Sequence, residues 1–346
     1  MAETKEVFEM ITRTRPDDGA LDRQHHRQQR RRRNERAVVF ALAAVLVAGS
    51  AVGIIAARRT AQPASSPTPT VATSTGPFLE GLDASTGAVV ATLATDVAPY
   101  RSDVSPDGTL IAFVKPADFG HGQIFVMRLD GTRERQLTGL QGQRGCGCGA
   151  IDPAWSPDGT TIAYSGMNLR GGRDIYLVNV TDGSIEQVTH SPLAGESEPT
   201  WSPDGRSIAF ERGVPRHGCC GSETTGSIVA MRLGNGRTGV IARMDDAGAP
   251  SWSPVGEWIV FNGVGGTSGT NGLWLVRPDG TQLHPLLRET EDDTMPAWSP
   301  DGSRIAFDRG QAVAIVDVAS GAVRDVGPIT DPAWSADGRT LYGWHT

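Results

Sequence analysis

The stretch Pro153-Ala-Trp155-Ser-Pro-Asp-Gly159, closely followed by Ile162-Ala-Tyr164, decides the fold prediction. Within Ser-Pro-Asp-Gly, the Pro presets one backbone angle and the Asp side chain can bond nearby amides. The Gly adopts left-handed conformations that other residues avoid. The segment therefore predicts a tight turn between two short strands, with Trp155 before the turn and the apolar triplet after it.

The same stretch recurs along the chain, which predicts a repeat protein. The repeated Ser lies at positions 105, 156, 202, 253, 299 and 335, so successive copies are 36 to 51 residues apart. A second apolar run and a second turn follow each copy, as at 175–180 and 182–183. We therefore expect each repeat to be a four-stranded antiparallel meander. The repeated Trp is expected to pack between sheets rather than bind a ligand, because it recurs at one position of the unit, at Trp155, Trp201, Trp252, Trp298 and Trp334.

The two ends of the repeat array complement each other. Residues 78–93 supply only the third and fourth strands of a unit, and the residues from 330 onward supply only the first and second. Joining both ends in one sheet closes a ring and removes the exposed sheet edges of an open array. The sequence thus predicts an all-β fold, a six-bladed β-propeller with two-plus-two strand closure, over residues 78–346.

The repeats resemble those of the TolB-type propellers, a WD-repeat-like family with recurring Pro-x-Trp-Ser-Pro-Asp-Gly, Ile-Ala-Phe and Asp-Ile-Tyr segments. The resemblance covers about residues 78–346 and departs at Val104 for Trp, Val255 for Asp and Ala336 for Pro. It implies an extracytoplasmic scaffold that binds other proteins, which in TolB itself are envelope lipoproteins and Tol components. The chain lacks the α/β domain that precedes the TolB propeller, so the specific partners are not expected to carry over.

Residues 37–57 form a stretch of 21 residues without a charged side chain. As a helix it would rise about 31 Å, enough to span a bilayer. The Arg cluster before it, including Arg30, Arg33 and Arg36, predicts a cytoplasmic tail at 1–36, with everything after the helix outside the plasma membrane. A Ser/Thr/Pro-rich linker follows at 58–77. The alternative is a cleaved signal peptide, which usually has a shorter apolar region of about 7 to 15 residues.

Composition and motifs exclude several functional classes. The chain contains no Gly-x-Ser-x-Gly pentad, P-loop or His-Glu-x-x-His motif, so we expect no enzyme activity and no cofactor or bound metal. The net charge is −7 although the tail at 1–36 is basic, so the remainder is strongly acidic. Such a surface repels phosphate, and no nucleic-acid partner is expected. A propeller hydrolase or lyase with a metal at its channel is a further alternative.

The residue before the repeated Pro is predicted to surround the mouth of the channel. These positions include Arg101, Asp152, Glu198 and Asp331, and the loop residues His121 and His217 are expected nearby. Three of the six ring positions are acidic, with Ala249 and Met295 at two of the others, and they predict a site for a cationic ligand, a metal or a basic peptide. The alternative is that the side chains cap loop amides or face solvent.

The four cysteines lie in two loops, Cys146 and Cys148 in one and Cys219 and Cys220 in the other. The strand order places both loops on one face of neighbouring blades. Outside the cytoplasm, two disulfides between the loops are expected, with the connectivity open. A four-thiolate zinc site is the alternative, although the spacing departs from the usual pairs of zinc ligands.

Together these features predict a membrane-anchored extracytoplasmic propeller that binds a protein or peptide as an envelope scaffold. The alternative is a single-pass sensor or regulator, in which a ligand bound outside changes what the cytoplasmic tail contacts.

Overall fold

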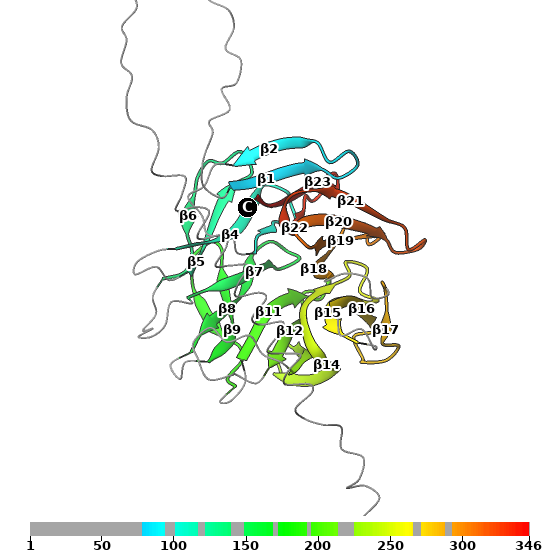
Figure 1. Cartoon of the computed structure of the whole chain (residues 1–346). Coiled ribbons are helices and arrows are strands. Elements are labelled where there is room, and N and C mark those ends of the chain that lie inside the picture. Colours follow the sequence, from blue (N-terminus) through cyan, green and yellow to red (C-terminus); the bar gives the residue numbers. More distant parts are fainter. Residues whose placement is uncertain are drawn as a thin grey trace, which may run out of the picture. The chain divides into compact units, whose positions relative to one another are not determined.

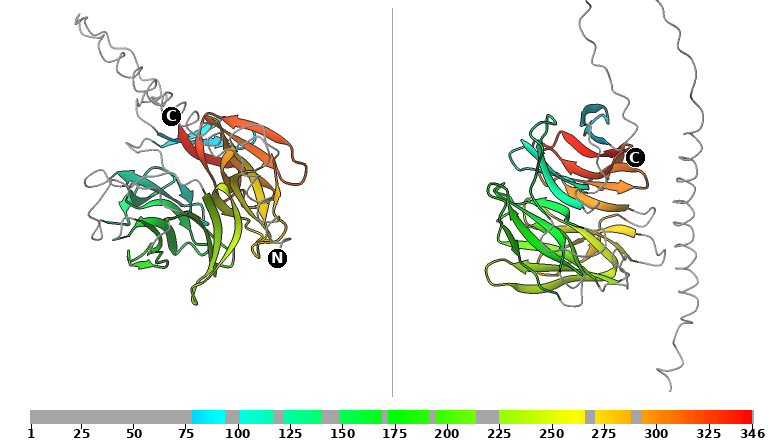
Figure 2. Two further views of the ribbon diagram at one scale, coloured as in Figure 1. Left: turned by 60° about the horizontal axis from the view of Figure 1, so that its bottom comes forward. Right: turned by 90° about the vertical axis from the view of Figure 1, so that its left-hand side faces the viewer.

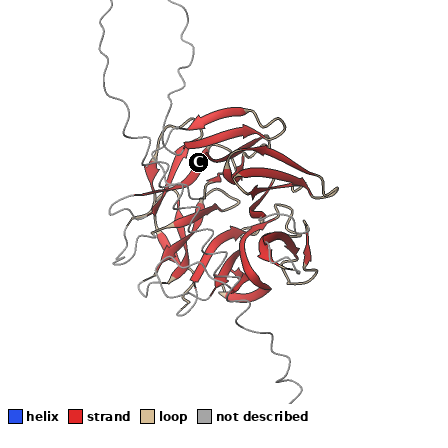
Figure 3. Ribbon diagram, in the orientation of Figure 1, coloured by secondary structure: helices blue, strands red, loops and turns tan. Residues whose placement is uncertain are grey.

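The computed structural model describes residues 78–93, 101–116, 122–139, 149–168, 172–191, 195–213, 225–265, 271–287 and 293–345. These residues lie within a compact unit at Val71–Thr346 and consist of strands and loops (Figure 3). In this part of the chain no helix has the length and apolar character needed to span a bilayer. The predicted tail, membrane helix and linker, at 1–77, lie outside the described residues.

The described strands form five antiparallel sheets arranged in a ring (Figures 1 and 2). The first sheet along the chain contains β3 (Asp103–Val104), β4 (Leu110–Pro116), β5 (Gly122–Arg128) and β6 (Arg135–Gln136). The second contains β7 (Ile151–Trp155), β8 (Thr161–Met167), β9 (Arg173–Asn179) and β10 (Ile185–Gln187). The sheet that follows has seven strands, β11 (Gly195–Trp201), β12 (Ser207–Gly213), β13 (Thr225–Arg232), β14 (Arg237–Trp252), β15 (Ile259–Val264), β16 (Asn271–Val276) and β17 (His284–Pro285). The fourth contains β18 (Asp293–Trp298), β19 (Arg304–Arg309), β20 (Ala312–Asp317) and β21 (Val323–Gly327).

The closing sheet joins the two ends of the repeat array, which confirms the predicted pairing. It contains β1 (Phe78–Asp83), β2 (Val89–Leu93), β22 (Thr330–Trp334) and β23 (Thr340–His345), in the order β2-β1-β23-β22. Strand β1 pairs with β23 from Phe78 opposite His345 to Asp83 opposite Thr340. Leu79 and its partner Trp344 are fully buried, so this pairing also contributes apolar contacts to the core.

The seven-stranded sheet differs from the predicted run of separate four-stranded units. It contains two copies of the repeat, and β14 is both the last strand of one copy and the first strand of the next. Elsewhere in the ring a loop separates these two strands. Here the 16 residues of β14 continue without one, so hydrogen bonding joins both copies in one sheet.

The core lies between successive repeats rather than within one of them. The described residues form six apolar clusters, and each takes residues from two neighbouring repeats. One cluster packs Ile228 of β13 against Phe261 of β15, across the seven-stranded sheet itself. Another joins Phe113 to Leu79 and Trp344, where the ring closes. Each sheet is therefore stabilised by its two neighbours.

The Ser-Pro-Asp-Gly segment forms the predicted turn in every copy. In the copy at 156–159, Ser156 Oγ donates to Asp158 Oδ1 over 2.7 Å, and the Gly159 amide donates to the Ser156 carbonyl over 2.9 Å. Gly159 has a φ of 69°, the left-handed region that favours glycine. Where Val255 replaces the Asp, the backbone bond remains but Ser253 Oγ is buried without a hydrogen-bond partner. This departure therefore leaves the turn intact and removes the carboxylate that, at Asp158, accepts from both Ser156 Oγ and the Thr160 amide.

Restoring that carboxylate is expected to stabilise the protein. Val255 is 64% exposed, so Val255→Asp adds an acceptor for Ser253 Oγ without removing core contacts. We expect the free energy of unfolding, measured with urea, to rise by about 1 kcal/mol. The gain should be smaller when Ser253→Ala is present in the same chain, where the new carboxylate can accept only from the Glu257 amide, as Asp158 accepts from the Thr160 amide. An equal gain in both backgrounds would contradict this account.

The repeated Trp links each sheet to the preceding one, as the packing prediction expected. The indole N–H of Trp201 donates to the Ala154 carbonyl over 3.1 Å, and that of Trp334 donates to the Ala297 carbonyl over 3.0 Å. Trp155 and Trp298 make the same kind of bond. At Trp252 the indole N–H is buried without a hydrogen-bond partner. The Trp thus combines apolar packing with a directional bond at four of its five positions.

This difference between two similar Trp residues gives a matched test. Trp201 and Trp252 are both half-buried, but only Trp201 donates to a carbonyl. We expect Trp201→Phe to lower the free energy of unfolding by about 1 kcal/mol more than Trp252→Phe, because only the first change leaves a carbonyl unpaired. Urea unfolding of the two variants measures the difference, and equal losses would rule out this role for the bond.

Candidate functional site at the axial channel

Five inner strands share an irregularity that β3 lacks, and two of the residues it displaces, Met295 and Asp331, line the axial cavity. In β7 the pairing register shifts between Ile151 and Ala154, and the same shift occurs in β11, β14, β18 and β22. The residue before the repeated Pro lies in this bulge and has a positive φ of 49° to 61° at all five positions, Asp152, Glu198, Ala249, Met295 and Asp331. Left-handed backbone costs a non-glycine residue about 1 kcal/mol or more, and bulges redirect side chains. The repeat therefore accepts local strain at the place where it forms the channel wall.

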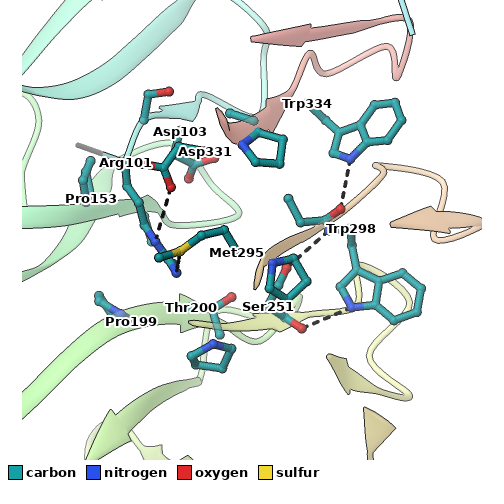
Figure 4. Close-up of a pocket in the computed structure, with 17 residues that line it drawn as sticks. Arg101, Asp103, Pro153, Pro199, Thr200, Ser251, Met295, Trp298, Asp331 and Trp334 are labelled. Carbon is teal, nitrogen blue, oxygen red and sulfur yellow. Dashed lines mark hydrogen bonds and ion pairs between the residues drawn. The ribbon is translucent and has the colours of Figure 1, made fainter. Parts of the chain in front are cut away.

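The bulges surround a cavity of about 160 Å³ on the axis (Figure 4). Its wall contains Arg101, Asp103, Met295 and Asp331 together with the repeated prolines, Pro153, Pro199, Pro250, Pro296 and Pro332. Proline has no amide hydrogen, so these positions add rigid apolar surface without a donor that needs a partner. The polar chemistry of the wall comes from the neighbouring residues.

Arg101 reaches across the cavity to residues of other repeats. Its Nη2 donates to Glu198 Oε1 over 3.1 Å and to Met295 Sδ over 2.8 Å, and its Nε lies 4.0 Å from Asp331 Oδ1. The side chains of Arg101 and Glu198 are 20% and 14% exposed. One guanidinium thus connects three repeats that are far apart in the sequence.

The electrostatics of the ring depend on this single cation. Burial opposes the charge of Arg101, but nearby Glu198, Asp152, Asp331 and Asp308 outweigh that effect and raise its pKa. Burial raises the pKa of Asp331 to about 6, with help from Asp152 and Glu198, although Arg101 acts in the opposite direction. Burial and the neighbouring Asp331 raise the pKa of Asp308 to about 8. Both shifts favour the neutral form of the carboxyl, which limits the negative charge that Arg101 must balance.

Several of the ring carboxylates and hydroxyls also satisfy backbone amides. The Glu198 amide donates to Ser165 Oγ over 3.0 Å, and Ser165 Oγ donates to Asp152 Oδ2 over 2.9 Å. The Asp331 amide donates to Asp308 Oδ1 over 2.9 Å, and the Ala249 amide donates to the Glu198 carboxylate. The alternative predicted from the sequence, in which ring side chains cap backbone amides, therefore holds for the Glu198 carboxylate. The same carboxylate also binds Arg101.

The structure brings together the four ring residues proposed from the sequence. Arg101, Asp152, Glu198 and Asp331 interact around the axis. His121, His217 and the four cysteines lie outside the described residues. Within the described part of the chain, no cluster of three or more His, Cys, Asp or Glu residues could hold a metal ion.

Sequence reasoning missed the second layer of the ring. Asp308 follows the repeated Ile-Ala-aromatic triplet directly, and so do Ser165, Glu211 and Asn262 in other repeats. The available signal in the sequence was a polar residue at the end of an otherwise apolar strand.

A further buried carboxylate, Asp103, was also missed. Burial of Asp103 raises its pKa to about 7, and its Oδ2 accepts from the Trp155 amide over 2.8 Å. This buried carboxylate occurs in one copy only, so the repeat pattern did not predict it.

The raised pKa of Asp308 predicts a pH dependence of stability. An Asp in an unfolded chain titrates near pH 3.8 and Asp308 near pH 8 in the fold, so the folded state binds more protons between these values. Stability is therefore lost as the pH rises through that window. Asp308→Asn keeps an oxygen that can accept the Asp331 amide and has no charge to bury. Between about pH 5 and pH 8 we expect it to gain more than about 1 kcal/mol relative to the original protein.

Urea unfolding at the two pH values measures this gain. Glu257→Gln, which removes an exposed carboxylate, serves as the control and should follow the original protein at both values. A parallel pH dependence for Asp308→Asn would show that Asp308 does not titrate in this range.

Comparisons with known proteins agree with this architecture. The TolB beta propeller domain family matches residues 87–218. An uncharacterized protein of Agrobacterium fabrum is 28% identical over 254 residues, which cover 68% of this chain and 66% of that protein. The chain thus spans just under two thirds of the length of this relative. The family match supports a TolB-type propeller.

Two solved structures have the same fold. A TolB from Agrobacterium tumefaciens superposes with a TM-score of 0.63 at 23% identity, covering 78% of this chain and 98% of that one. An oligogalacturonate lyase from Vibrio parahaemolyticus gives a TM-score of 0.53 at 18% identity, covering 78% of each chain. At these identities the likeness shows the fold alone. Because the fold occurs in both a TolB and a lyase, function has to be argued from the site.

Proposed function

We propose that this chain is a membrane-anchored extracytoplasmic propeller that binds a protein partner at the mouth of its axial channel. The TolB-like fold supports a protein-binding scaffold. The anchor at 37–57, the cytoplasmic tail at 1–36 and the disulfides are proposals that rest on the sequence. The absence of enzyme activity and the presence of six blades are proposals as well.

The blade number follows from how the repeats pack. In the seven-stranded sheet, β12 and β13 of one repeat pack through apolar side chains against β15 of the next. Strands of one continuous sheet layer cannot cover each other in this way. We therefore count β11 to β14 as one blade and β14 to β17 as the next, which gives six blades with the remaining four sheets.

The observation that carries the binding proposal is the ring of strained bulges around Arg101. Positive φ values occur at five equivalent positions, of which Met295 and Asp331 line the axial cavity and Glu198 contacts Arg101, and strain of this kind is concentrated at functional sites. The ring holds Asp152, Glu198 and Asp331 but one guanidinium, so acidic groups outnumber basic ones. A Lys or Arg side chain of a partner would share these carboxylates with Arg101. We therefore propose a partner that presents a basic peptide segment.

Cross-linking of the full-length protein in cells, followed by mass spectrometry, tests this proposal. The test variant combines Asp152→Asn, Glu198→Gln and Asp331→Asn, and Glu257→Gln is the matched control on the exposed surface. We expect an extracytoplasmic protein to be captured by the original protein and by the control, and lost by at least tenfold in the test variant. A thermal melt of each variant separates loss of binding from loss of folding.

The other outcomes contradict the proposal in distinct ways. Equal capture by the triple variant would place the binding surface away from the channel. Cross-links confined to residues 1–36 would favour the sensor or regulator alternative. Location is tested separately, because protease added to intact cells should degrade the propeller and spare the tail at 1–36.

A further inference from the structure

A second cavity lies between the first two sheets of the ring. It has a volume of about 280 Å³ and is lined by residues of β5, β8, β9 and β10 and of the segments beside them, including Gln123, Thr138, Tyr164, Tyr176 and Gln187. It shares no lining residue with the axial cavity. Its volume lies just below the range of about 300 to 1,000 Å³ that is typical for drug-sized ligands. The cavity volume therefore suits one small molecule that contains a single ring.

Two stacked tyrosines form the aromatic part of this cavity. The rings of Tyr164 and Tyr176 lie 5.6 Å apart between centroids, with an interplanar angle of 22°. They are paired directly across β8 and β9. At Gly166 an added Cβ would lie 2.7 Å from the ring of Tyr176, so this glycine makes room for the ring.

Comparison of the repeats shows that the pair of tyrosines occurs in this blade alone, although the closing sheet has Tyr342 at the Tyr164 position opposite Gly81. The strand pair that holds Tyr164 and Tyr176 here holds Phe113 and Phe125 in the preceding repeat, also stacked. Phe also occupies the Tyr164 position at 210, 261 and 307. A phenylalanine thus satisfies the packing, and the tyrosines add polar atoms that the fold does not require.

Unused hydrogen-bonding groups point to a ligand. Tyr164 is only 5% exposed, yet its hydroxyl has no hydrogen-bond partner among the described residues. Gln123 is 2% exposed, and its carbonyl oxygen accepts from Thr138 Oγ1 over 2.7 Å, while its amide nitrogen has no described partner. Neither atom is among the fully enclosed unpaired atoms of the described residues, so both face the space of the cavity, where a ligand or water can reach them. The Tyr176 hydroxyl makes one long contact of 3.5 Å, to the Met167 carbonyl.

The chemistry of the free groups limits what can bind. Gln187 uses its amide nitrogen on Asp174 Oδ2 and the Thr189 carbonyl, which leaves its side-chain oxygen as an acceptor. The cavity therefore offers neutral donors and acceptors from several sides and an aromatic surface. No Lys, Arg, Asp or Glu is among its described lining residues. Hydrogen-bonding groups that surround the edge of a ligand, with an aromatic surface against its face, suit a ligand ring that carries several hydroxyls.

We propose that this cavity is a binding site for a neutral pyranose sugar. The aromatic pair contacts the apolar face of the sugar ring, and Tyr164, Gln123 and Gln187 bind its hydroxyls. The site is independent of the axial channel and of the partner proposed there.

Saturation-transfer NMR with the full-length protein tests this assignment, in a detergent without a sugar headgroup. The probes are glucose, galactose and N-acetylglucosamine, with glucuronate as the charged counterpart and uridine as a planar ring. We expect at least one neutral pyranose to bind, with glucuronate and uridine at least fivefold weaker. Tyr164→Phe should weaken that binding about three- to tenfold, the loss expected for one hydrogen bond.

Tyr342→Phe is the matched control. Tyr342 occupies the equivalent position in the closing sheet, where its strand partner is Gly81 rather than a second tyrosine. This variant should bind the sugar as the original protein does, and thermal melts should show both variants folded. The proposal is overturned if none of the three pyranoses binds, which would leave water alone in the cavity. It is also overturned if uridine binds more tightly, or if Tyr164→Phe binds as well as the control.

Discussion

Each inner strand that carries the repeated Trp, which excludes β3 with Val104, must meet two requirements within four residues. Its Trp has to reach the preceding sheet, where the indole N–H donates to a backbone carbonyl at four positions. The residue three positions earlier has to leave the strand plane and face the axis, which the bulge and the positive φ achieve. The intervening Pro has no amide hydrogen that would need a partner there. The packing of the sheets and the wall of the channel are consequences of this one segment.

The axial ring is a charge cluster that carries its own cation. In a low-dielectric channel, acidic side chains without a counterion would shift to their neutral forms. Arg101 reduces that penalty by contacting Glu198 and lying close to Asp331, and protonation of Asp308 reduces it further. The remaining carboxylates give the mouth its acidic character. The partner proposed for this mouth would therefore have to compete with Arg101 for the Glu198 carboxylate.

Departures from the repeat carry more functional information than the repeat itself. Val255 in place of Asp removes one bond in a turn, and its effect stays local. Arg101 in place of an acidic or small residue supplies the only guanidinium at the ring positions. The Tyr164 and Tyr176 pair adds two hydroxyls to a blade interface that needs none. Each repeat position can thus be judged against the other copies of the same chain.

The repeat, its strand order and the closure by both ends could be predicted from the sequence alone. These features depend on local turn chemistry and on periodic apolar residues, so they can be recognised in a single repeat and checked in the next. The bond from Arg101 to Glu198, the raised pKa of Asp308 and the continuous strand β14 required the tertiary structure. They depend on which residues meet in space, although these residues lie up to about two hundred positions apart in the sequence. They also depend on how deeply the residues are buried, which no local sequence pattern shows. The Tyr164 cavity belongs to the same class, because its free hydroxyl is evident only when its surroundings are known.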